Sequence, residues 1–202
     1  MGGCVGLAFL IWVSIESFLG FRFYLAIEQE VEEVEEVNLL LAAQEMVENY
    51  GHLPYLFGGN HPDQGGFDCS GSIEYLLSSL GYDVPRTSEQ QYLWLKQEGC
   101  LHMVDQNARS LQDDSFGSLQ KGDLIFWSGT YQPTDNRSIG VTHVALYMGR
   151  QKDGRPLIAC SSSGRSYRGQ KREGFGLYDF VLPRQGSSSR VIAYGPLPKG
   201  GG

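Results

Sequence analysis

Cys69 is the residue of this 202-residue chain whose surroundings best fit a chemical role. It stands in the segment DCSG at residues 68–71, directly after a glycine-rich stretch at residues 58–66. Apolar residues then recur at helical spacing up to Leu80, so we predict a short helix that begins here. The first turn of a helix offers unpaired N–H groups and a positive dipole end, which favour a thiolate. The position indicates a nucleophilic cysteine, and the alternative is a cysteine packed in the core.

A nucleophilic thiol needs a base nearby, and a histidine is the usual one. The chain has four histidines, and His143 opens a predicted buried strand, HVALYMG, at residues 143–149. The other three, His52, His61 and His102, lie in polar segments typical of surface loops. His143 is therefore the candidate base, and the alternative is a histidine that merely begins a strand.

A third polar group is expected to orient the imidazole through its other nitrogen. The predicted return strand at residues 156–160 runs on into serines and carries no histidine. Alternation along this strand places Ala159 and Ser161 on one face and Cys160 on the other. We predict Ser161 as the orienting group, with a backbone carbonyl or a water molecule as the alternatives.

The elements that must position these residues can be read from periodicity and turn signals. The sequence predicts three helices, at residues 37–50, 69–80 and 87–97. It predicts strands at residues 124–127, 143–149, 156–160, 175–182 and 191–194. Helices followed by a meander of short strands favour an α+β domain, in which N-terminal helices pack on a central antiparallel sheet.

Two segments precede this domain. Residues 1–27 are strongly apolar, particularly residues 5–25, but they lack the basic start of a typical export signal. Residues 28–36 form an acidic run that we interpret as a solvated helical linker. We expect the apolar segment to act in export or in membrane association, or else to pack on the domain. The predicted division is an N-terminal segment and linker at residues 1–36 and a globular domain at residues 37–198.

Composition excludes some classes of protein. The formal net charge is −7 and no basic stripe is present, which argues against nucleic-acid binding. The basic residues between positions 165 and 172 are few and interrupted by glycine, so we interpret them as a solvated turn, with contact to an anionic ligand as the alternative. The four cysteines match no zinc pattern. We therefore expect no metal, no cofactor and no obligatory disulfide.

Five short motifs occur along the chain in a characteristic order. They are YLFGG at 55–59, FDCSG at 67–71, PRTS at 85–88, KGDLIF at 121–126 and HVALYMG at 143–149. Together they resemble the NlpC-type family of bacterial cell-wall cysteine peptidases, over roughly residues 38–195. The resemblance implies a papain-like fold and hydrolysis of peptidoglycan stem peptides, usually between γ-D-glutamate and the diamino acid. It also implies action in the cell envelope.

The resemblance implies roles for individual residues as well. Cys69 would attack the substrate and His143 would be the base. Five further residues would bind substrate: Tyr55, Asp68, Ser70, Arg86 and Ser88.

Three of those substrate-binding roles have plainer alternatives. Tyr55 would lie near the nucleophile and assist the oxyanion or the substrate, unless it is only a core aromatic. Asp68 would hold an amine of the peptide, unless it only caps the helix. Arg86 would flank the same subsite, unless it is an ordinary surface charge.

The missing histidine on the return strand departs from the family pattern and leaves other functions open. These are an amidase or acyltransferase of the same fold, and a catalytically weak module that binds wall peptides.

Overall fold

The computed structural model describes residues 5–135 and 137–198, with side chains in the first helix described at position 22 and from position 26 onward. The helices are α1 (Val5–Tyr50), α2 (Cys69–Ser79) and α3 (Ser88–Gln97), with 3-10 turns η1 (Pro62–Gln64) and η2 (Asp114–Phe116). The strands are β1 (Asn60–His61), β2 (Gly66–Phe67), β3 (His102–Met103), β4 (Leu124–Ser128), β5 (Val141–Arg150), β6 (Pro156–Ser162), β7 (Ser166–Tyr167), β8 (Gln170–Lys171), β9 (Gly174–Asp179) and β10 (Arg190–Gly195).

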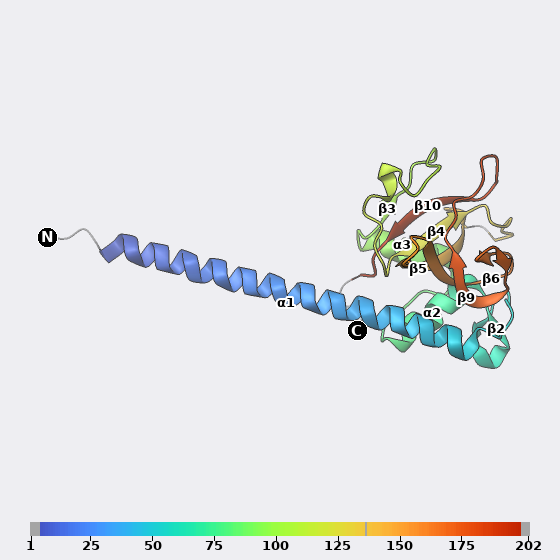
Figure 1. Ribbon diagram of the computed structural model, residues 1–202, viewed down its shortest axis with the longest axis horizontal. Coiled ribbons are helices and arrows are strands. Elements are labelled where there is room, and N and C mark those ends of the chain that lie inside the picture. The colour runs from blue at the N-terminus through green and yellow to red at the C-terminus, as the bar shows by residue number, and fades with distance from the viewer. Residues whose placement is uncertain (1–4, 136, 199–202) are drawn as a thin grey trace. The chain divides into compact units, whose positions relative to one another are not determined.

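A six-stranded sheet in the order β3-β10-β4-β5-β6-β9 forms the centre of the domain (Figure 1), and every neighbouring pair is antiparallel. Its central strands read as almost continuous apolar runs, because both faces of the sheet are covered. The α2 and α3 helices both pack against β5. The predicted α+β architecture, with helices packed on an antiparallel sheet, is confirmed.

Alternation along the strands divides the core into two clusters. Val144 and Leu146 of β5 and Ala159 of β6 face the helices. Ala145 of β5 and Cys160 of β6 face the opposite side, where Phe116, Phe180 and Val104 cover the sheet. Because of this division, only strand residues on the same face as His143, the candidate base, can reach its imidazole.

The chain divides into two compact units, residues 1–38 and residues 39–202. In the first unit the chain is helical from Val5 onward, and the valines of the acidic run, Val31 and Val34, are half exposed. The second unit includes the last turns of α1, where Leu39, Ala43 and Met46 are buried in the domain core.

The N-terminal segment differs in one respect from the sequence prediction. The apolar stretch, the acidic run and the first predicted helix are consecutive parts of α1 rather than separate elements. The side chains of residues 5–21 and 23–25, on which the expectation of membrane association depends, lie outside the described residues. Over the part of the chain that is described, no helix has the length and apolar character needed to span a membrane. The predicted division at residue 36 stays a prediction.

Candidate active site

Cys69 is the first residue of α2, as its sequence predicts. Asp68 is the N-cap residue in an extended conformation, and its Oδ1 accepts a hydrogen bond of 2.6 Å from the N–H of Gly71. At the other end of the helix, Gly81 adopts a φ of 91°, a conformation that glycine tolerates and that ends helices. Gly71 must be glycine for a different reason, because a Cβ there would lie 2.1 Å from the carbonyl oxygen of Gly59. The glycine-rich loop therefore packs directly on the first turn of α2.

The Cys69 thiol is a protonated group in this structure. Its side chain is 6% exposed, and burial, followed by the nearby carboxylate of Asp68, raises the pKa of Cys69 to about 11. Backbone N–H groups of Val144, Ser70 and Cys69 face the sulfur and lower the pKa, but less than burial raises it. The N–H groups at the helix start thus favour a thiolate, as the sequence predicts, but in the free protein burial outweighs them.

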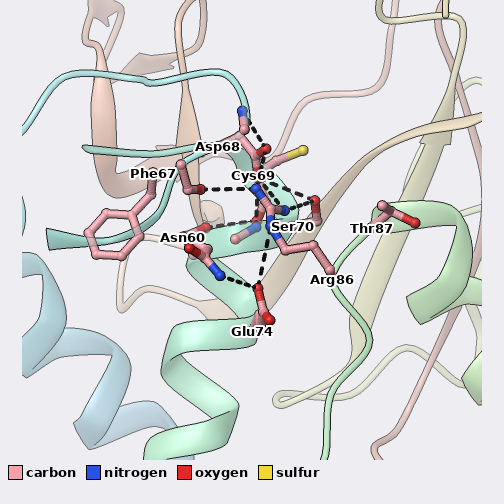
Figure 2. A network of polar contacts seen from close by, with 12 residues as sticks. Asn60, Phe67, Asp68, Cys69, Ser70, Glu74, Arg86 and Thr87 are labelled. Atoms are coloured by element: carbon pink, nitrogen blue, oxygen red, sulfur yellow. Dashed lines mark hydrogen bonds and ion pairs between the residues drawn. The ribbon is translucent and has the colours of Figure 1, made fainter. Parts of the chain in front are cut away.

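Asp68 and Arg86 form the centre of a polar network beneath the first turn of α2 (Figure 2). Arg86 Nη2 lies 2.8 Å from Asp68 Oδ2 and Arg86 Nη1 lies 3.1 Å from Asp68 Oδ1, a bidentate pair. The guanidinium also donates to Ser70 Oγ at 3.1 Å and lies 3.5 Å from Glu74 Oε2. The N–H of Gly58 donates to Asp68 Oδ2, which ties the glycine-rich loop into the same network. Figure 2 shows the Cys69 sulfur pointing away from this network.

This network gives three predicted substrate residues a structural role. The carboxylate of Asp68 accepts hydrogen bonds from two backbone N–H groups, from Arg86 and from the Ser70 hydroxyl. Ser88 is 4% exposed, and its hydroxyl donates to the carbonyl of Val141 at 3.4 Å. The structure thus places Asp68, Ser70 and Arg86 around the start of α2, where they bind one another, and places Ser88 at the start of α3, bonded to the β5 backbone.

His143 lies on β5, one residue before the Val144 N–H that faces the Cys69 sulfur. Its imidazole is 8% exposed and packs edge-on against Trp127, with ring centroids 5.2 Å apart. Burial, followed by the positive charge of Arg165, holds the pKa of His143 well below its ordinary value. Burial therefore favours the neutral form of both the Cys69 thiol and the His143 imidazole in the free protein.

The side chain of Ser161 does not contact His143, so Ser161 is not its orienting group. Its hydroxyl donates a hydrogen bond of 2.6 Å to the carbonyl of Phe67, and its own N–H donates to Ser72 Oγ. Ser161 shares its strand face with Ala159, which packs with the helices, whereas His143 packs on Trp127 in the opposite layer. The Ser161 hydroxyl therefore fixes β2, the strand that precedes Cys69, to β6.

Arg165 is the side chain that contacts the second imidazole nitrogen. Its Nε donates to His143 Nε2 at 3.3 Å, and its guanidinium lies 4.5 Å from the ring centroid of Trp127. The interpretation of the 165–172 segment as a solvated turn is wrong for this residue. The sequence signal was weak, because an arginine three residues after a serine-rich strand does not reveal which neighbouring strand its side chain contacts.

A cleft of about 650 Å³ opens beside His143. Its walls come from four loops and from the ends of β4, β5 and β6, and include Tyr55, Phe57, Trp127, Tyr131, Thr142, Ser162 and Arg165. Tyr55 is the predicted substrate residue that the structure does place on this cleft. Its pKa is raised by burial and then by the nearby Cys69, so its phenol stays protonated and can donate a hydrogen bond.

Comparison with known proteins adds an independent observation. Residues 51–174 match the NlpC/P60 family. The chain is 29% identical over 159 residues to the gamma-DL-glutamyl hydrolase of Bacillus subtilis, covering 75% of this chain and 33% of that protein. It is 30% identical over 118 residues to the bifunctional muramidase/DL-endopeptidase CwlT of the same organism, covering 58% of this chain and 28% of that protein.

Among solved structures, an NLP/P60-family protein described as similar to lipoprotein, from Staphylococcus aureus, aligns with a TM-score of 0.42 at 26% identity, over 69% of this chain and 35% of that one. The chain spans about a third of the length of the curated relatives named here. The family match covers more than half of the chain and includes both Cys69 and His143. The protein belongs to the NlpC/P60 family.

Proposed function

We propose that this domain is a cysteine endopeptidase that hydrolyses peptidoglycan stem peptides, at the bond between γ-D-glutamate and the diamino acid. The observation that carries the proposal is the position of Cys69. Its thiol begins α2 and faces the β5 backbone beside His143, within the region that matches the NlpC/P60 family. The two similar Bacillus subtilis proteins are named as a hydrolase of gamma-DL-glutamyl bonds and as a DL-endopeptidase, which supports this choice of bond.

The residues would act in a familiar sequence for a thiol peptidase. His143 accepts the thiol proton of Cys69, and the resulting thiolate attacks the carbonyl carbon of the scissile amide. The oxyanion receives hydrogen bonds from the N–H of Cys69 and from the Tyr55 hydroxyl. The imidazolium then gives its proton to the leaving amine. Water attacks the thioester, again with His143 as the base, and releases the acid product and the free thiol.

Purified peptidoglycan and synthetic stem peptides provide the test, with products identified by mass spectrometry. The wild-type protein should release fragments that end in γ-D-glutamate. Cys69→Ala should lower the rate by roughly 1,000-fold or more, because no other group can form the thioester. Cys100→Ala is the matched control and should keep full activity, since this half-buried cysteine donates to the carbonyl of Glu98 in the turn after α3. Full activity in Cys69→Ala would refute the proposal.

A second candidate is a module that binds wall peptides without cutting them efficiently. The protonated state of Cys69 and the contact of Arg165 with His143 favour it. Binding of stem peptides with no product after prolonged incubation would support this candidate. Products cut at an amide outside the peptide stem, or acyl transfer to an added amine, would instead indicate an amidase or an acyltransferase of the same fold.

We further propose that the protein acts in the cell envelope, where stem peptides are accessible. Cell fractionation tests this directly, since export predicts recovery outside the cytoplasm. Recovery with the membrane that is lost when residues 5–25 are removed would assign that association to the apolar segment.

A further inference from the structure

Arg165 has an unusual environment for an arginine of this domain. It lies in the turn between β6 and β7, where it is partly buried, lines the cleft and stacks over Trp127. Among the residues that the structure describes, no carboxylate forms an ion pair with it. Three other arginines of the domain do have carboxylate partners, and these are Arg86, Arg137 and Arg155. Arg165 therefore presents an uncompensated positive charge to the cleft.

The hydrogen bond from Arg165 also fixes the protonation of His143. A guanidinium can only donate, so His143 Nε2 must be the acceptor and must lack a proton. The tautomer assigned from this hydrogen bond is the neutral imidazole with its proton on Nδ1. An imidazolium carries protons on both nitrogens, so it cannot form while Nε2 accepts from Arg165. The base thus cannot take the thiol proton in the arrangement seen here.

We propose that Arg165 holds His143 in this inactive state until a carboxylate of the substrate binds the guanidinium, which couples activation of Cys69 to recognition of an acidic peptide. The inference rests on the proposed function. A γ-linked glutamate keeps a free α-carboxylate close to the bond that is cut, and the diamino acid can supply another. Either group could form the bidentate pair that a guanidinium prefers.

The proton balance of this step is simple. When the carboxylate binds the guanidinium, Arg165 Nε no longer donates to His143 Nε2, and that nitrogen becomes free. The imidazole proton can then move through water from Nδ1 to Nε2, which leaves Nδ1 free to accept the thiol proton and gives a thiolate and an imidazolium with no change in total charge. Arg165 is a positioning residue in this scheme, because it acts on the reaction through His143 and through the substrate carboxylate.

The first test uses Arg165→Met, which keeps much of the side-chain packing on Trp127 but removes the charge and the donors. Arg168→Met is the matched control, since Arg168 is exposed on the same hairpin and stacks on Tyr167 instead. The substrates are a stem peptide with free carboxylates and two versions, one amidated at the α-carboxylate of D-glutamate and one at the diamino acid. The readout is kcat/KM for each peptide with each protein.

Wild type and Arg168→Met should prefer the free carboxylate at one of the two positions by roughly 10- to 100-fold, the range of a charge-assisted hydrogen bond. Arg165→Met should lose that preference, and the sensitive position identifies which carboxylate is bound. An undiminished preference in Arg165→Met, or no preference in the wild type, would overturn the inference while leaving the proposed function intact.

The second test needs no turnover. Nitrogen-15 NMR of the full chain should show His143 of the wild type with its proton on Nδ1 and an unprotonated Nε2. In Arg165→Met this signal should change, and iodoacetamide should alkylate Cys69 several-fold faster at pH 7 than in wild type or Arg168→Met. If wild type cleaves no peptide, the proposed function fails, and these two readouts still decide the role of Arg165. An identical His143 signal and alkylation rate in Arg165→Met and wild type would refute it.

Discussion

At the scale of single residues, the charge states of Cys69 and His143 are set by burial more than by their neighbours in sequence. The helix dipole and the backbone N–H groups stabilise a thiolate, each by an amount typical of a partial charge. Moving a thiolate out of water costs more free energy than the dipole and the N–H groups supply, and repulsion from the Asp68 carboxylate beside it adds to that cost. Burial therefore favours the uncharged forms of Cys69 and His143 in the free protein.

This state predicts the pH dependence of Cys69 alkylation in the free protein. A raised pKa means that the thiol keeps its proton to higher pH, so the rate with iodoacetamide should climb through pH 9 to 11. At pH 7 the thiolate fraction at a pKa of about 11 is lower by roughly 100-fold or more than at the ordinary thiol pKa of ~8.5. Peptide mapping by mass spectrometry separates Cys69 from the more exposed Cys100, which should react first. Faster reaction at Cys69 than at Cys100 at pH 7 would contradict the prediction.

At the scale of elements, the start of α2 is held by a buried ion pair rather than by the cap alone. Asp68 accepts from Gly71 inside the helix and from Gly58 in the preceding loop, and Arg86 joins both to the segment before α3. The side chain of Asp68 is 11% exposed and that of Arg86 is 29% exposed. Loss of Asp68 therefore leaves a largely buried guanidinium with only the carboxylate of Glu74, 3.5 Å away, as its ion-pair partner.

Asp68→Ala should lower the free energy of unfolding by roughly 2–4 kcal/mol, from the lost cap and the loss of the bidentate partner of Arg86. Urea denaturation measures this directly. Asp153→Ala is the control, because Asp153 pairs with Arg155 at the surface, where the two side chains are 52% and 33% exposed. That variant should change stability by less than about 1 kcal/mol. Equal losses in the two variants would show that the Asp68 network contributes no more than a surface pair.

At the scale of the whole molecule, α1 belongs to both compact units of the chain. The first unit ends at residue 38, and the turns that follow bury Leu39, Ala43 and Met46 in the domain. The same helix exposes half of Leu41, only two residues after the first buried position. Burial along α1 therefore follows its helical period within the second unit.

Removal of residues 1–36 should leave the thermal midpoint and the hydrolytic activity of the domain unchanged. Among the α1 side chains that the structure describes, those buried in the core lie beyond the deletion, as do Cys69 and His143. Within the shortened protein, Met46→Ala should cost roughly 2–4 kcal/mol, whereas Leu41→Ala should change stability by no more than about 0.5 kcal/mol. Differential scanning calorimetry and peptide digestion provide the readouts. Unfolding of the truncated protein would show that residues 1–36 contribute to the core.

Much of the local structure followed from the sequence. The Asp68 cap, the apolar spacing up to Leu80 and Gly81 predicted α2 to within a residue at each end, because capping and periodicity are local properties. The central strands were likewise predicted by runs of apolar residues between turn signals. The motif order around Cys69 and His143 predicted the family that the matched region shows.

The charges and partners of the site were decided by the tertiary structure. Alternation correctly separated Ser161 from Cys160, but it could not tell which face His143 would use, since that depends on how β5 packs against β4 and Trp127. The pairing of Arg86 with Asp68 and the reach of Arg165 to His143 join residues 18 and 22 positions apart. The pKa of Cys69 depends on the burial of its thiol, which comes from packing across α2 and β5. Sequence patterns report local geometry, whereas burial and long-range charge contacts exist only once the chain is folded.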